Sequence, residues 1–281
     1  MIQKILLNIF SGLKGILVNT YFTPKQKIYL IGDYVAFALL LIPVVLCKMK
    51  IHKVYIRTFG YTVYVHNFAA FFYIFNEIFC KSVYTPYTLR TYMDLGANIG
   101  LTILWYKFFN PDLEITAFEP DKYNYKIVLK NISINHLSKV TVYNVALCDK
   151  KGTMPFYTLL DDIQNLDSAL TLNQNFPYKK YPVKTDKLST YIKKPIDLIK
   201  MDIEGAEYQV LDDLFKSNAI YKIKSIIFES HYFNTLQEKL LPPVIRKLKK
   251  LGTIRSLKNS DATTIFHFVS TSYKSTRSVH F

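Results

Sequence analysis

The sequence contains few cysteines and few glycines. Its three cysteines, Cys47, Cys80 and Cys148, are far apart, odd in number and never arranged as C-x-x-C. This distribution argues against a disulfide framework and against a zinc site, and it favours a reducing, cytoplasmic compartment. Only nine of the 281 residues are glycine, so two glycines close together need a physical reason.

Acidic residues are scarce relative to basic ones. The chain has 36 lysines and arginines against 21 aspartates and glutamates, a net charge of +15. Such a charge attracts anions and is weakened by salt, so it suits nucleic acid, a membrane surface, an acidic glycan or an anionic small molecule, or else a lysine-rich solvated surface. Half of the residues are apolar, which excludes general disorder and predicts one large domain or a domain with an added segment.

Charge is absent from one stretch near the start of the chain. Residues 34–47, YVAFALLLIPVVLC, have lysines on both sides. The run is short for a membrane span, reaches bilayer length only by including Gly32 and Asp33, and contains Pro43, which we expect to interrupt a helix near its end. No small-residue cleavage pattern follows it, which argues against a secretory signal. We favour a packing helix; the alternatives are peripheral membrane association through residues 28–47 and a true span.

The hydrophobic pattern predicts three regions. Residues 1–52 form an apolar helical segment, residues 53–272 form the main domain, and residues 273–281 form a basic tail. A hairpin around Gly60 and an apolar helix over 69–79 come first in the main domain.

From residue 91 onward, strands and helices alternate. This alternation predicts a parallel sheet with helices on both faces. Residues 148–187 break it and are predicted to form an insertion over the edge of the sheet. The predicted strands are 91–95, 114–120, 139–147, 196–202 and 223–230, with 253–257 and 264–270 as a closing antiparallel pair; the predicted helices are 99–109, 121–135, 205–216 and 234–250.

Gly96 and Gly100 follow the first of these strands, directly after Asp94. In a doubly wound sheet, ligands bind beyond the carboxyl ends of the strands, where the strand order reverses. Glycine there tolerates positive backbone angles and admits a close approach, and the next helix presents free amides. The G-x-G-x-x-G pattern is absent because Asn98 and Leu101 stand at two of its glycine positions. A pyrophosphate is therefore disfavoured, and a nucleoside carrying an amino acid is favoured.

Glu119 closes the second strand at the same edge, where its carboxylate can accept hydrogen bonds from both ribose hydroxyls. Asp94 is expected to hold an ammonium group, directly or through water. Asn144 is expected beside the adenine, with Ala146 as an apolar neighbour. The alternative is a plain strand-to-helix turn with a capping acid. The predicted S-adenosylmethionine site consists of Asp94, Gly96, Asn98, Gly100, Glu119 and Asn144.

Five segments between residues 56 and 231 together resemble the FkbM family of S-adenosylmethionine-dependent methyltransferases. They are MDLGANIG, AFEP, NVALCDKKG, TDKLSTYIKKPIDLIKMDIEGAEYQVL and IIFESH. The resemblance implies a class I, Rossmann-like α/β fold with a seven-stranded, mostly parallel sheet, and usually O-methylation of a small molecule or sugar. It does not extend to the first fifty residues or to the basic tail.

Acidic residues and a histidine end the fourth and fifth strands. Asp202 and Glu204 are two residues apart, as are Glu229 and His231, so each pair is expected to face one side. Methyl transfer is an in-line displacement that requires an aligned acceptor and a group to take its proton. We therefore predict catalytic roles for Asp202, Glu204 and His231, with His231 as the preferred base. The alternatives are a helix cap at Glu204 or Glu207 and a structural hydrogen bond at His231; a divalent metal is not implied.

The leading hypothesis is a methyltransferase that uses S-adenosylmethionine to modify a hydroxyl of a small molecule, sugar or glycan unit. Ser168, in the insertion, is predicted to face this acceptor. A nucleic-acid methyltransferase, suggested by the basic segment 245–258, is disfavoured because the sequence has neither a separate RNA-binding module nor an NPPY-type motif. A non-catalytic membrane-surface protein that retains the fold is the third hypothesis. The pattern identifies neither the acceptor nor the oligomeric state.

Overall fold

The computed structural model of the chain describes residues 2–85, 87–159, 168–169, 178–231, 235–259, 263–271 and 273. Seven strands form its central sheet, of which six run in one direction and one, β13, runs in the opposite direction near one edge. The strands that share one direction are β3 (Thr91–Leu95), β4 (Glu114–Phe118), β5 (Val140–Tyr143), β10 (Ile196–Met201), β11 (Ile223–His231) and β12 (Gly252–Asn259); β13 (Thr263–Ser270) lies antiparallel between β11 and β12. Their order is β12-β13-β11-β10-β3-β4-β5.

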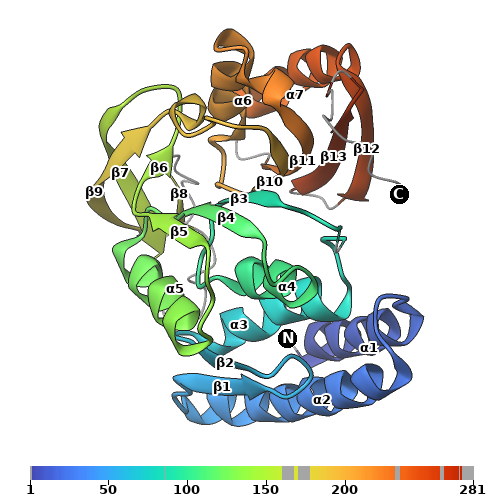
Figure 1. Cartoon of the computed structure of the whole chain (residues 1–281). Helices are drawn as coiled ribbons and strands as arrows, with labels where there is room; N and C mark the ends of the chain where they lie inside the picture. Colours follow the sequence, from blue (N-terminus) through green and yellow to red (C-terminus); the bar gives the residue numbers. More distant parts are fainter. Residues whose placement is uncertain are drawn as a thin grey trace.

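Helices cover both faces of this sheet (Figure 1). One face carries α3 (Phe68–Phe75) with its π-helical extension (Asn76–Cys80), α4 (Leu101–Phe109) and α5 (Lys122–Ile134); the other carries α6 (Glu207–Lys216) and α7 (Thr235–Lys249), with short 3-10 turns at Leu188–Thr190 and Ala219–Lys222. The alternation along β3 explains the two layers, because Tyr92 packs in the core with α4 while Met93 and Leu95 pack in the core with α6. The predicted seven-stranded, mostly parallel sheet with helices on both faces is confirmed.

The strand order reverses at β3. This strand pairs in parallel with β4 on one side and with β10 on the other. The carboxyl ends of these three strands therefore meet at one edge, as predicted, and the loops that follow them carry the candidate residues. We call this edge the carboxyl edge.

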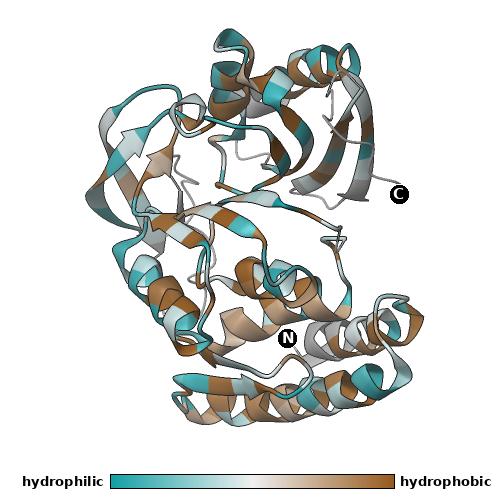
Figure 2. Cartoon of the chain, viewed as in Figure 1, coloured by the Kyte–Doolittle hydropathy of each residue, from teal (hydrophilic) through white to brown (hydrophobic). Residues whose placement is uncertain are grey.

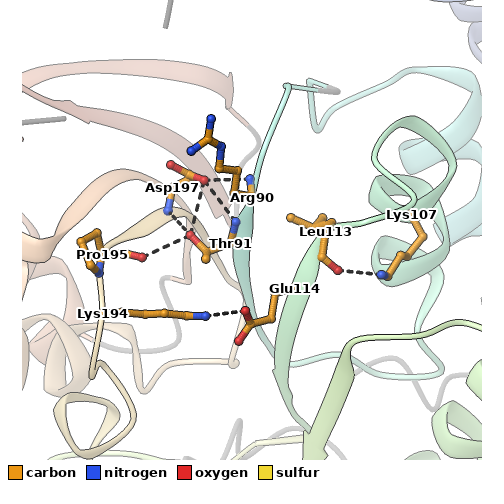
Figure 3. Close-up of polar contacts among 8 residues, drawn as sticks. All are labelled: Arg90, Thr91, Lys107, Leu113, Glu114, Lys194, Pro195 and Asp197. Carbon is orange, nitrogen blue, oxygen red and sulfur yellow. Dashed lines mark hydrogen bonds and ion pairs between the residues drawn. The ribbon is translucent and has the colours of Figure 1, made fainter. Parts of the chain in front are cut away.

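At the opposite edge, a polar network connects the amino ends of the same three strands (Figure 3). One carboxylate oxygen of Asp197, on β10, accepts hydrogen bonds from the backbone amides of Arg90 and Thr91 at 2.8 and 3.1 Å. The hydroxyl of Thr91 accepts the amide of Asp197 at 2.9 Å. Lys194 pairs with Glu114 at the start of β4. These contacts hold β3, β4 and β10 in register at their amino ends.

The N-terminal elements form a further layer outside α3 and α4 (Figure 1). They are α1 (Ile2–Val18), α2 (Pro24–Cys47) and a hairpin of β1 (Lys53–Ile56) and β2 (Tyr61–Tyr64) that turns at Gly60 as predicted. Side chains of α5 and of the residue directly after it hold the outer edge of β2: Asn131 accepts the amide of Tyr64 at 2.7 Å and Asn135 accepts that of Thr62 at 2.9 Å. Buried residues of this layer and of the main domain share one core.

Helix α2 is longer than predicted, because it continues beyond Pro43 to Cys47. The missing amide of Pro43 leaves the carbonyl of Leu39 without its helical donor. Leu39 lies on the outer side of the molecule, where its side chain is 62% exposed. The carbonyl can therefore be solvated, and the helix tolerates the proline.

The predicted strand 139–147 divides into two. Its first part is β5, and its second part, β6 (Ala146–Leu147), belongs to a separate sheet. The break lies at Asn144, whose side-chain amide donates to the carbonyls of Glu119 and Pro120 at 2.8 and 2.9 Å. The predicted insertion folds as this second sheet, in the order β6-β9-β7-β8, with β7 at Gly152–Leu159, β8 at Ser168–Ala169 and β9 at Tyr178–Asp186.

Candidate active site

Gly96 is required by the protein's own backbone. Its φ of +81° lies in the left-handed region, and a Cβ there would lie 1.9 Å from the carbonyl oxygen of Asp202. We expected a ligand to occupy the space beside this glycine. The loop after β10 occupies that space instead. The amides of Gly96 and Ala97 both donate to the carbonyl of Phe118 at 3.0 Å. The first loop is thus tied to β4 and closely packed against the loop after β10.

The rest of the glycine loop turns with two further positive φ angles. Asn98 has φ +51°, and its side-chain oxygen accepts the amide of Ile99 at 2.7 Å. Gly100 has φ +89°, and a Cβ there would lie 2.7 Å from Val128 on α5. Gly100 therefore lets α4 pack against α5. Helix α4 begins at Leu101, two residues later than predicted, because this turn must finish first.

Glu119 is oriented by one backbone amide of the glycine loop and one of its own loop, which follows β4. One carboxylate oxygen accepts the amide of Asn98 at 2.7 Å and the other accepts that of Asp121 at 2.9 Å. The residue is 5% exposed, and burial raises its pKa to about 8. Each carboxylate oxygen has a second lone pair. The side chain is thus suited to accept two hydroxyl groups when it is ionised.

Asp94 is paired with a cation inside the protein. It lies opposite Lys200 in the parallel register of β3 and β10, and the ammonium of Lys200 is 3.5 Å from its carboxylate. The same ammonium donates to the carbonyl of Gly96 at 2.8 Å, while the hydroxyl of Thr102 donates to the other oxygen of Asp94. Asp94 is completely buried, and burial raises its pKa although Lys200 and Thr102 oppose that change.

Lys200 connects Asp94 with Asp202. Its ammonium is 3.6 Å from the carboxylate of Asp202, whose side chain is 29% exposed. Burial alone would lower the pKa of Lys200, but the carboxylates of Asp202 and Asp94 outweigh it, so that the pKa lies above its ordinary value. Sequence reasoning did not assign this residue a role. The available signal was a lysine within the apolar strand IDLIKM.

Tyr84, in the segment before β3, is a second buried residue to which the sequence analysis assigned no position near these carboxylates. Burial raises the pKa of its hydroxyl well above the ordinary value, and the carboxylates of Asp202 and Glu229 raise it further. Its carbonyl accepts the indole of Trp105 at 2.9 Å. The segment before β3 has no pattern that would have indicated this position.

The loop after β10 differs from the extended chain that we predicted. Strand β10 ends at Met201, and Glu204 has φ +54° in the following turn. The two-residue alternation therefore does not reach from Asp202 to Glu204. Glu207 holds the turn, since its carboxylate accepts the amides of Ile203 at 3.2 Å and Gly205 at 3.0 Å. Glu207 therefore holds the turn before α6, whose N-terminus has no side-chain cap hydrogen bond, and a chemical role for Glu204 stays a prediction.

Asn144 follows β5 and His231 ends β11, both at the carboxyl edge, whereas Ser168 belongs to the second sheet. Asn144 uses its side-chain amide to hold the loop after β4, as described, so its contact with adenine stays a prediction. His231 ends β11 beside Thr263, but its side chain lies outside the part of the structure that is described; the same holds for Ser168 in β8. The proton acceptor and the acceptor-facing serine are therefore still predictions.

The second sheet reaches the carboxyl edge through Tyr181, whose hydroxyl donates to Asp121 at the start of α5. Asp121 also caps α5 by accepting the amides of Tyr123 and Asn124, both at 2.8 Å. This contact connects the insertion to the loop that orients Glu119. Among the side chains that the structure describes, no three acidic, histidine or cysteine residues are grouped as metal ligands.

The chain was compared with known proteins. A family model described as "Methyltransferase FkbM domain" matches residues 94–254, more than half of the chain. Methyltransferase sdnD of Sordaria araneosa is 29% identical, in an alignment that covers 50% of this chain and 67% of that protein. Methyltransferase 1 of Beauveria bassiana is 27% identical over 50% of this chain and 66% of that protein.

Among solved structures, the methyltransferase FkbM of Methylobacillus flagellatus matches with a TM-score of 0.48 and 14% identity, covering 95% of this chain and 60% of that one. The chain thus spans about two thirds of the length of the curated relatives it matches. The matched region begins at Asp94 and includes β3, β4 and β10, whose ends form the carboxyl edge.

Proposed function

Since this chain belongs to the FkbM methyltransferase family, we propose that it transfers a methyl group from S-adenosylmethionine to a hydroxyl oxygen of a small molecule, such as a sugar or glycan unit. The family and the sheet make it a methyltransferase with a class I fold. The methyl donor and the kind of acceptor are our proposal.

The observation that supports this proposal is the arrangement around Glu119. Its two oxygens are held by amides from the glycine loop and from the start of α5, which directs a carboxylate to the position where a nucleoside ribose is expected. In the described part of the chain, the basic side chain that contacts this loop is that of Lys200, which faces inward to Gly96 and Asp94. The described residues therefore suit a nucleoside without phosphates.

Asp94 is enclosed beside a cation of the protein itself. We expected Asp94 to hold the ammonium of the donor, but the carboxylate is enclosed and its neighbour is the ammonium of Lys200. A second cation would be repelled there. We propose that Asp94 instead acts through Lys200, which holds the carbonyl of Gly96 and so keeps the glycine loop in shape for binding.

We propose that Asp202 orients the acceptor. It is the more exposed partner of Lys200 and follows β10, next to the glycine loop. When bound, S-adenosylmethionine supplies an electrophilic methyl group. The carboxylate of Asp202 accepts a hydrogen bond from the acceptor hydroxyl and aligns its oxygen, and such alignment accounts for much of the catalysis in an in-line transfer. His231 stays the preferred proton acceptor.

Calorimetric titration with S-adenosylhomocysteine tests the donor assignment. The wild-type chain should bind, and Glu119→Ala should weaken binding by about tenfold or more, because two hydrogen bonds to a charged group are lost. Glu114→Ala is the matched control, since Glu114 begins the same strand at the opposite edge and its side chain is 52% exposed. A folded wild-type chain that does not bind would contradict the proposal.

A labelling experiment tests the acceptor class. Methyl-labelled S-adenosylmethionine is incubated with the protein and a set of hydroxylated small molecules, and the products are treated with mild alkali. A methyl ether keeps its label, whereas a methyl ester loses it. Alkali-labile label would show a carboxylate acceptor and would reject hydroxyl methylation while leaving the donor assignment intact.

A further inference from the structure

Helix α2 has an apolar outer side that no described part of the chain covers. Its inner side is buried in the main core, through residues such as Tyr34 and Phe37. On the outer side, five large aliphatic residues follow one another at intervals of seven, four, three and four residues, which places them along one line of the helix. They are Ile28 (69% exposed), Val35 (41%), Leu39 (62%), Ile42 (55%) and Leu46 (72%). We call these five residues the α2 stripe.

The stripe lies on the outside of the whole molecule. Figure 1 shows α2 at the end farthest from α6 and α7, alongside α1 and the hairpin. Hydrophobic residues continue along α2 in Figure 2. Helix α1 adds exposed Phe10, Leu17 and Val18 to this layer. A row of exposed aliphatic residues along one helix is a candidate interaction site.

Helix α2 is long and apolar enough to cross a membrane. It is, however, fastened to the protein along its length. The carboxylate of Asp33, only 2% exposed, accepts the amide of Thr58 at 3.0 Å and the guanidinium of Arg57 at 3.2 Å. A spanning helix would have to break these bonds and place Asp33 in hydrocarbon. The helix also differs from the core helix of a soluble protein, since only 28% of its most apolar eighteen-residue stretch is buried.

The charges near the stripe identify its partner. Between residues 28 and 47 the only charged residue is Asp33, which points inward. Exposed lysines stand beyond both ends, with Lys25 before the stripe and Lys48, Lys50 and Lys53 after it. Beside the stripe, α2 carries the apolar residues Ala36 and Leu40. The guanidinium of Arg57, whose side chain is 59% exposed, lies 3.6 Å from the position of a Cβ at Gly32. An apolar band bordered by lysines and an arginine suits acyl chains bordered by anionic headgroups.

We propose that the α2 stripe docks this protein on an anionic lipid bilayer, with α2 lying in the plane of the membrane interface. The net charge of +15 adds long-range attraction to such a surface. Docking requires no change in the fold, because the stripe is already exposed while α2 is packed on the main domain. The proposal is independent of the identity of the methyl acceptor.

Vesicle flotation of the full chain tests this inference. The protein should float with vesicles of phosphatidylcholine and phosphatidylserine, should float less with phosphatidylcholine alone, and should be released by raised salt. The variant Leu39→Glu/Ile42→Glu should reduce partitioning by roughly a hundredfold, since each large aliphatic side chain contributes about tenfold. Tyr221→Glu, which changes a residue 52% exposed beyond α6, is the matched control and should float like the wild type.

A second variant addresses charge alone. Lys48→Glu/Lys50→Glu leaves the stripe intact and should remove the preference for phosphatidylserine. Both variants should retain the wild-type circular dichroism, since all four substituted side chains are exposed. Equal flotation of the wild type and the Leu39→Glu/Ile42→Glu variant would overturn the proposal. So would a wild-type dimer in analytical ultracentrifugation that this variant dissociates without any vesicle binding, because the stripe would then be a contact between copies. Resistance to extraction by alkaline carbonate would indicate a span and would also overturn it.

Discussion

The two buried carboxylates beside the glycine loop differ in what neutralises them. Asp94 has the ammonium of Lys200 at 3.5 Å, whereas among the described residues the hydrogen-bond donors to Glu119 are the backbone amides of Asn98 and Asp121. Their contributions should therefore separate experimentally, with Asp94 affecting mainly stability and Glu119 mainly the binding of a nucleoside.

The raised pKa of Glu119 predicts that binding depends on pH. Only the ionised carboxylate accepts from two hydroxyls, and burial raises this pKa to about 8. The ionised fraction therefore grows as the pH rises through that value, so the affinity for adenosine should increase from about pH 6 to about pH 9 and then level off. Isothermal titration at several pH values measures this. Glu119→Gln, which cannot ionise, should bind weakly at every pH; a wild-type affinity that falls over this range would refute the assignment.

The pair of Asp94 and Lys200 should contribute strongly to stability. Lys200→Met leaves the buried carboxylate of Asp94 without a compensating charge, and this should lower the free energy of unfolding by about 3–5 kcal/mol. The double variant Lys200→Met/Asp94→Asn removes both charges and should recover part of the loss. Urea denaturation of the wild type, Lys200→Met, Asp94→Asn and the double variant gives the coupling energy. Strictly additive losses would show that the two side chains act independently.

At the scale of elements, the N-terminal layer is joined to the main domain by side chains that cap backbone groups. Asn131 on α5 and Asn135 directly after it accept backbone amides of β2, as a neighbouring strand would. Within the layer, Asp33 on α2 accepts a backbone amide from the turn of the hairpin. The boundary predicted at residues 52 and 53 thus separates two kinds of sequence pattern but lies within a single hydrophobic core. Whether the two parts are separate domains stays a prediction.

Asp33 and Arg57 should contribute unequally to the attachment of α2. Asp33→Ala leaves the amide of Thr58 without its acceptor and should lower the free energy of unfolding by about 1–3 kcal/mol. Arg57→Ala should cost less than about 1 kcal/mol, because the arginine side chain is 59% exposed and its ion pair is screened by water. Thermal unfolding compares the two variants. Equal losses would mean that the ion pair, and not the backbone hydrogen bond, fastens the helix.

For the whole molecule, the shared core predicts that the main domain is not stable without α1 and α2. A chain that begins at Lys53 loses the contacts of Leu30, Tyr34, Phe37 and Leu41, all of them buried. Each such side chain contributes about 1.5–3 kcal/mol, against a total stability of about 5–15 kcal/mol. The shortened chain should aggregate or bind a hydrophobic dye. If it stays soluble and binds S-adenosylhomocysteine like the full chain, the N-terminal layer is a separate unit.

The sequence by itself determined the alternation of strands and helices, the position of the glycine loop and the acid that closes the second strand. These features are local, because burial repeats within a few residues and a glycine with positive φ belongs to a single turn. It also indicated the methyltransferase family, which the comparison confirms. The local pattern predicted an extended strand at two positions where the structure has none. At Asn144, a hydrogen bond to the carbonyl of Glu119 accompanies the end of β5, and Glu204 lies in a turn with positive φ.

The tertiary structure alone decided which residues meet. The register of β3 against β10 places Lys200 beside Asp94, and the loop after β10 occupies the space that Gly96 leaves. It also decided that the inner side of α2 is buried while the α2 stripe stays exposed. Contacts between segments far apart in the chain depend on how the whole sheet and its helices pack. The spacing of neighbouring residues does not determine that packing.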